Sequence, residues 1–112
     1  MRRSATASIL ASLWLTTATS ALAQSTPEEA ARKLFDEGLA AEGAGDKARA
    51  CEKFRASLQM QRELGPLEKV KDCDAKEGKI LSAKLNLNEL ILRWPTPGPE
   101  LDAMRKEVGR LD

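Results

Sequence analysis

Three pairs of similar residues, each pair separated by the same 33 positions, constrain what this chain can fold into. The pairs are Gly45 and Gly78, Ala50 and Ala83, and Phe54 and Leu87. A fixed offset of this size is typical of helical hairpins that repeat along a chain. The small residue lets two helices approach where they cross, and the large residue one turn later fills the space beside them. We therefore predict an all-α fold with about two hairpins of antiparallel helices.

Glycine and proline divide the chain into five predicted helices. Thr26-Pro27 is a helix start, because threonine caps the first-turn amides and proline suits the first helical position. Gly43–Gly45 ends the first helix, and Asp46 caps the second. Gly65-Pro66 ends the second helix and opens the third, and Gly78 marks the turn before the fourth. No alternating strand pattern interrupts this series.

Apolar and small residues recur at helical spacing along one side of each predicted helix. From the first helix to the last, these stripes are Ala31, Leu34, Phe35, Gly38 and Ala41; Ala50, Cys51, Phe54, Ser57 and Leu58; Leu67, Val70 and Cys73; Ile80, Ala83, Leu87, Leu90, Ile91 and Trp94; and Leu101, Met104, Val108 and Leu111. The prolines in 95–99 prevent the fourth helix from continuing. We expect residues 100–112 to form an amphipathic helix that caps the hairpins of residues 24–94, covering Leu87, Leu90 and Trp94.

The segment from Ala31 to Met60 resembles a tetratricopeptide repeat. The features that carry the resemblance are Leu34 and Gly38 in the first helix, Gly45-Asp46 at the turn, and Ala50-x3-Phe54 with Ser57 in the second helix. Glu37 and Ala41 depart from the family pattern. A second unit, from Leu64 to Arg93, departs further at Lys71 and Asp74, where a small and an aromatic residue are usual. We expect either a displaced third helix or side chains that reach outward to water.

A narrower resemblance adds an expectation about where the protein works. The stretches Leu34–Gly38, Ala50–Phe54 and Asp72-Cys73 are similar to repeat proteins exported by Gram-negative bacteria. The resemblance implies a protein–protein interaction module or scaffold of the cell envelope, without a cofactor.

In the tetratricopeptide family, the first helix of each hairpin lines a groove that takes a peptide or protein partner. In this chain those helices present Arg32, Phe35, Asp36, Leu39 and Glu42, followed by Glu68, Lys69, Asp72 and Lys76. An aromatic residue among charges is a suitable peptide anchor, which makes Phe35 a candidate together with Leu39. The alternative is that Phe35 belongs to the core.

The two cysteines lie 22 residues apart on the predicted second and third helices, and both fall on apolar faces. Because those helices are neighbours in the repeat geometry, Cys51 and Cys73 are candidates for a disulfide in an oxidising compartment. The alternative is two small buried hydrophobic residues, which free cysteines resemble.

Residues 1–23 have the three parts of a secretory signal peptide. Met1-Arg2-Arg3 is a positive start, an apolar run follows in 9–15, and Ala21-Leu22-Ala23 supplies small residues for cleavage between Ala23 and Gln24. Polar and small residues interrupt the run well short of the roughly 18 apolar residues that a membrane span needs. We therefore predict export, followed by a periplasmic or secreted location.

Composition weighs against several functional classes. The 18 Lys and Arg nearly balance the 17 Asp and Glu, so no strong field favours nucleic acid. The chain has no histidine, which rules out imidazole metal sites and the usual catalytic triads. The carboxylates lie close to Lys or Arg on the predicted helices, where exposed ion pairs are their ordinary role. We expect no catalytic residues, no metal and no cofactor.

The sequence leaves three interpretations of function open. One is a module whose groove binds an extended peptide or another envelope protein. The second is a structural component that self-associates, with a homodimer contact through Leu101, Met104 and Val108 of the C-terminal helix. The third is a remnant of a longer repeat protein, in which Lys71 and Asp74 reflect relaxed packing.

Overall fold

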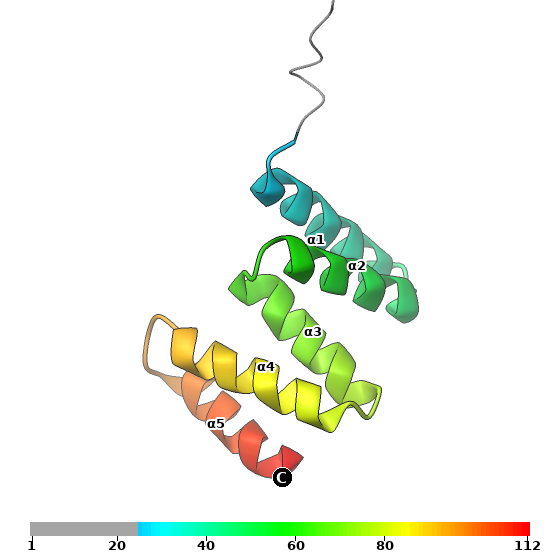
Figure 1. Cartoon of the computed structure of the whole chain (residues 1–112). Helices are drawn as coiled ribbons and strands as arrows, with labels where there is room; N and C mark the ends of the chain where they lie inside the picture. Colours follow the sequence, from blue (N-terminus) through cyan, green and yellow to red (C-terminus); the bar gives the residue numbers. More distant parts are fainter. Residues whose placement is uncertain (1–24) are drawn as a thin grey trace, which may run out of the picture.

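The computed structural model describes residues 25–112, which fold as five α-helices with no strand among them (Figure 1). The helices are α1 (Pro27–Gly43), α2 (Lys47–Met60), α3 (Leu64–Lys76), α4 (Ile80–Arg93) and α5 (Pro99–Leu111). The predicted all-α class is confirmed. The expected signal peptide and its cleavage between Ala23 and Gln24 lie outside the described residues.

Consecutive helices pack against one another and form antiparallel hairpins, which follow in chain order from α1 to α5 (Figure 1). The turns that close the α1–α2 and α3–α4 hairpins contain the same three backbone hydrogen bonds, displaced by 33 residues. The donors and acceptors are Ala44 to Ala40, Gly45 to Glu42 and Asp46 to Ala41 in the first turn, and Glu77 to Cys73, Gly78 to Ala75 and Lys79 to Asp74 in the second. Gly45 and Gly78 have φ values of 82° and 78°, where a side chain would be strained. The 33-residue offset is therefore a repeat of structure as well as of sequence.

The crossing of α1 and α2 depends on a glycine. Gly38 is buried, and a Cβ atom at this position would lie only 2.6 Å from Cε1 of Phe54. Phe54 is 1% exposed and Ala50 is 2% exposed, so the α2 side of the crossing is closely packed. The close approach therefore depends on small residues and one large ring, as the repeat pattern predicts.

The C-terminal helix covers the end of the second hairpin. Leu101 and Met104 of α5 belong to the same buried cluster as Leu87 and Leu90 of α4, and Trp94 packs against its edge. An ion pair between Lys71 Nζ and Glu107 Oε2, at 3.1 Å, links α3 to α5. This is the arrangement expected of a capping helix.

Two local predictions were wrong. The second helix ends at Met60 rather than at Gly65-Pro66, and these two residues lie in the first turn of α3. Proline is tolerated there because the first-turn amides have no partner within the helix. Ile80 is 40% exposed rather than part of the buried stripe, since it is the first residue of α4, directly after the turn.

One of the two expectations for the second unit, that Lys71 and Asp74 reach outward to water, is wrong. Both are buried, with exposed fractions of 5% and 3%. Asp74 accepts hydrogen bonds from Arg55 at 3.0 Å, Ser82 at 2.6 Å and Asn86 at 3.3 Å. Buried polar groups are tolerated when their hydrogen bonds are satisfied, and this carboxylate connects α2, α3 and α4.

Candidate functional site

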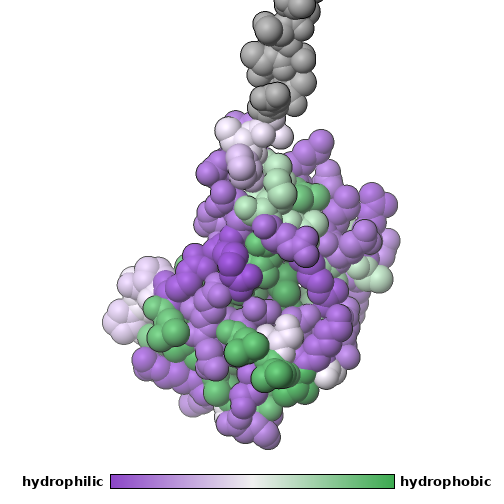
Figure 2. Space-filling model, viewed as in Figure 1, coloured by the Kyte–Doolittle hydropathy of each residue, from purple (hydrophilic) through white to green (hydrophobic). Residues whose placement is uncertain are grey.

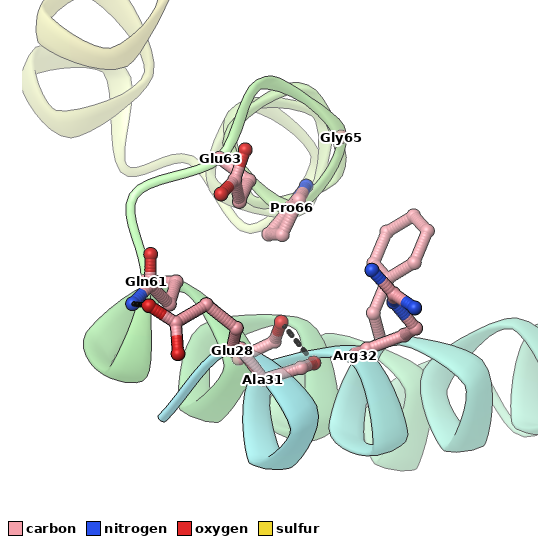
Figure 3. A pocket seen from close by; sticks show the side chains of 9 residues that line it. Glu28, Ala31, Arg32, Gln61, Glu63, Gly65 and Pro66 are labelled. Carbon is pink, nitrogen blue, oxygen red and sulfur yellow. Dashed lines mark hydrogen bonds between the residues drawn. The ribbon is translucent and has the colours of Figure 1, made fainter. Parts of the chain in front are cut away.

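A cavity of about 360 Å³ opens between α1, the end of α2 and the start of α3 (Figure 3). Its lining comes from three segments that the first hairpin and the following turn bring together. These residues are Glu28, Ala31, Arg32 and Phe35 of α1; Ser57 of α2 and Gln61 just after it; and Glu63, Gly65 and Pro66 at the start of α3.

The wall of this cavity is apolar and tightly fixed. The hydroxyl of Ser57 donates a 2.7 Å hydrogen bond to the Ala31 carbonyl, which ties α2 to α1 beneath the cavity. The ring of Phe35 lies 5.5 Å from that of Phe54, and a Cβ atom at Gly65 would be 3.3 Å from it. Phe35 is half-buried. It packs against the buried core and also lines the cavity, and its role as a peptide anchor stays a prediction.

The rim of the cavity is charged and has two different ends. Figure 3 shows Glu28, Gln61 and Glu63 toward one side and Arg32 toward the other. The side chain of Gln61 donates to Glu28 at 3.3 Å, which holds this carboxylate at the mouth. Arg32 makes no ion pair with any residue in 25–112. The rim can therefore receive a cationic group at one end and a carboxylate at the other.

A second cavity, of about 260 Å³, lies at the other end of α1 and α3. Glu42 of α1 pairs with Lys69 of α3 at 2.7 Å across its edge, and Lys76 also lines it. Its wall contains a disulfide between Cys51 and Cys73, whose Cα atoms are 5.9 Å apart. The bridge joins α2 to α3 and fixes the second hairpin on the first.

Asp72 lines this second cavity but is already engaged. Burial opposes the charged form of Lys71, yet hydrogen bonds from its ammonium to Asp72 and Glu107 outweigh that effect and raise the pKa of Lys71. The distance from Lys71 Nζ to Asp72 Oδ1 is 2.7 Å. The carboxylate of Asp72 thus serves the α3–α5 contact and is less available to a ligand.

The structure does not bring the seven predicted partner-binding residues into one site. Arg32 and Phe35 line the first cavity, and Lys69, Asp72 and Lys76 line the second. Asp36 faces a shallow depression along α1, which Arg32 also borders. Leu39 is 39% exposed and lines none of these three hollows.

Sequence reasoning missed the rim residues Glu28, Gln61 and Glu63. A second helix that continues to Gly65-Pro66 leaves no room for the turn that contains Gln61 and Glu63, and no glycine or proline marks this turn. The one available signal was Glu28 itself, an acidic residue in the first turn of a helix, which is ordinarily explained by the helix dipole.

Comparisons with known proteins return nothing: no family model, no curated protein and no solved structure matches this chain. Within residues 25–112, no three His, Cys, Asp or Glu side chains are grouped so that they could hold a metal ion. In that same part of the chain, every helix is too short or too polar to cross a membrane. The expectation of no cofactor stays a prediction.

Proposed function

We propose that this chain is an exported, tetratricopeptide-like binding module of a bacterial cell envelope, and that it binds an extended peptide segment of a partner protein along α1 and α3. The observation that carries the proposal is the first cavity, which combines an apolar wall at Phe35 with a rim of opposite charges. Peptide sites characteristically combine one apolar anchor pocket with a few oriented polar groups.

The geometry of the cavity defines the peptide chemistry that would fit it. One apolar side chain would pack against Phe35 and Pro66. A carboxylate on one side of that residue would meet Arg32, and a basic residue on the other side would meet Glu28 and Glu63. The partner segment is thus an apolar residue flanked by residues of opposite charge.

The disulfide supports the export part of the proposal. Bridges such as Cys51–Cys73 persist in oxidising compartments and are rare in the cytosol. If the full coding sequence is expressed in a Gram-negative host, the protein should be recovered from the periplasmic fraction. Its intact mass should correspond to a chain that begins at Gln24 and lacks two hydrogens. Recovery of the 112-residue chain from the cytosol would contradict this assignment.

The binding proposal can be tested with a random heptapeptide library displayed on phage. Selected peptides should share the pattern of an apolar residue between opposite charges. Arg32→Glu should weaken their binding by at least about tenfold, the loss expected for one charge-assisted contact. Lys33→Glu is the matched control, because Lys33 is the exposed neighbour of Arg32 on α1 and does not line the cavity.

Both variants must first show the same helicity as the parent by circular dichroism. If Arg32→Glu and Lys33→Glu bind the selected peptides equally well, the cavity is not the peptide-binding site. A selection that enriches no common pattern would contradict the proposed function itself.

A further inference from the structure

The outward face of α4 carries an apolar stripe that the fold does not use. Leu81 is 74% exposed, Leu85 is 62% exposed and Leu92 is 86% exposed, whereas Ala83, Leu87 and Leu90 on the opposite side of the helix are fully buried. Figure 2 shows apolar groups gathered on the face where α4 lies in Figure 1. The helix therefore has two apolar sides, of which only one packs against α3 and α5.

The repeat shows that this stripe is not required for folding. The α2 residues 33 positions earlier occupy the same place in the first hairpin, and they are polar or small. The corresponding pairs are Ala48 and Leu81, Glu52 and Leu85, Arg55 and Asn88, and Gln59 and Leu92. Apart from Arg55, which bonds to Asp74 of α3, the first hairpin thus turns a hydrophilic face to water, whereas the second turns a row of leucines.

The spacing of the stripe fits a second helix alongside it. Leu81, Leu85, Asn88 and Leu92 follow one another at intervals of four, three and four residues, which is the seam pattern of two helices that pack side by side. In coiled coils a single polar residue at a core position can fix the register and the oligomeric state. The seam spans most of α4, which is about 21 Å long.

We propose that α4 packs in parallel against α4 of a second copy of this chain, forming a two-fold dimer. In a two-fold parallel arrangement each seam residue meets its own copy, so Asn88 faces Asn88 and the two amides can hydrogen-bond. An antiparallel arrangement would instead place Asn88 opposite Leu85 and leave the amide beside an apolar side chain.

The charges that flank the seam favour the same arrangement. Lys84 lies on one side of it and Glu89 on the other, five residues later. In a parallel pair of helices this is the spacing at which a lysine of one copy lies beside a glutamate of the other. Each already has a partner within its own chain, Asp112 for Lys84 and Arg62 for Glu89, so the dimer would extend existing ion pairs.

The dimer surface is separate from the C-terminal face that the sequence first suggested for self-association. Leu101 and Met104 are buried against α4 within the chain, and Val108 packs at the edge of the same cluster. The α4 stripe is also distinct from the cavity at Arg32 and Phe35, so a failed dimer and a failed peptide site give different results.

Sedimentation equilibrium tests the proposal with protein purified after expression of the full coding sequence. From about 5 to about 500 µM, the parent should pass from monomer to dimer with a dissociation constant of about 10–100 µM, since the stripe is smaller than a standard interface. Leu85→Glu, which installs the residue found at the matching position of α2, should leave only monomer. Met60→Glu is the matched control, because Met60 is a 45% exposed apolar residue of α2 and not part of the α4 stripe.

A cysteine cross-link tests the parallel orientation. Both natural cysteines are in the disulfide, so Asn88→Cys introduces the only free thiol among residues 25–112. Mild oxidation should convert this variant to a covalent dimer, whereas Glu52→Cys on the equivalent face of α2 should stay monomeric.

Three results would overturn the proposal. The first is that the unmutated protein stays monomeric at every concentration up to about 500 µM, whether or not its signal peptide has been removed. The second is a dimer that persists in Leu85→Glu. The third is an Asn88→Cys variant that fails to cross-link under conditions in which the parent is dimeric.

Discussion

Replacing Gly38 by alanine is the most direct test of how the first hairpin is packed. The added methyl group would lie 2.6 Å from Cε1 and 2.7 Å from Cδ1 of Phe54, where ordinary carbon contacts are about 3.5–4.0 Å. The ring has no room to withdraw, because Phe54 is 1% exposed and Phe35 lies against it at 5.5 Å. The helices must therefore separate by close to 1 Å.

Two opposing effects set the size of the change. Alanine is favoured over glycine within a helix by about 1 kcal/mol. Overpacking a tight core costs about 1–3 kcal/mol, and the upper part of that range applies where backbones must move. We expect a net loss of about 1–2 kcal/mol in the free energy of unfolding, which lowers the Tm of a domain of this size by roughly 5–15 °C.

The control is Gly43→Ala, at the end of the same helix. A Cβ atom there meets nothing within 4 Å, so this variant should be as stable as the parent or slightly more stable. Urea unfolding followed by circular dichroism measures all the free energies.

The second hairpin suggests a way to relieve the clash, because Leu87 occupies the position that Phe54 holds in the first. In a Phe54→Leu background, Gly38→Ala should cost less than about 0.5 kcal/mol. The difference between its cost in this background and its cost in the parent measures the coupling between the two sites. The reasoning would be refuted if Gly38→Ala were as stable as the parent, or if its cost were the same in both backgrounds.

Three further predictions concern the links between the hairpins. Replacing both Cys51 and Cys73 by alanine should lower the free energy of unfolding by about 3 kcal/mol, and a reductant should then no longer change the Tm, as it should in the parent. Asp74→Ala should cost about 1–3 kcal/mol in urea unfolding and Asp74→Asn less, because alanine removes the buried acceptor that three partly buried hydrogen bonds share. Arg62 holds the pKa of Glu89 below its ordinary value of 4.5. The stabilisation from the Arg62–Glu89 ion pair is complete above pH 4.5 and is lost as the pH falls through the lowered pKa. Arg62→Gln should therefore flatten the acid side of a plot of unfolding free energy against pH. An unchanged plot would contradict the pairing.

The features that sequence predicts well here are those that depend on neighbouring residues. Gly45 and Gly78 mark both hairpin turns, because the left-handed conformation at each position selects glycine. Thr26 and Asp46 cap their helices through bonds to the amides of residues three positions later. The end of α2 was misplaced because the turn at 61–63 has no such marker.

The features that sequence does not predict depend on residues far apart in the chain. Nothing around Lys71 shows that Glu107, 36 positions later, will lie within reach of its ammonium. Likewise, the rim of the first cavity exists only because Gln61 lies beside Glu28, 33 residues away. The predicted groove residues were chosen from one face of each helix, whereas the cavity also takes residues from the α2–α3 turn.

The second hairpin differs from the first in a consistent way: it has polar residues inside where the first has small ones, and leucines outside where the first has polar or small residues. Inside, Lys71 replaces Gly38 and Asp74 replaces Ala41, and outside, leucines replace the polar residues of α2. Decay of an unused repeat would leave some buried polar atoms without partners, yet among the described residues no buried side-chain nitrogen or oxygen lacks one. The polar groups inside connect α3 to α2, α4 and α5. This exchange of polarity supports our two proposals, in which the first hairpin offers the peptide cavity and the second offers the surface for a second copy of the chain.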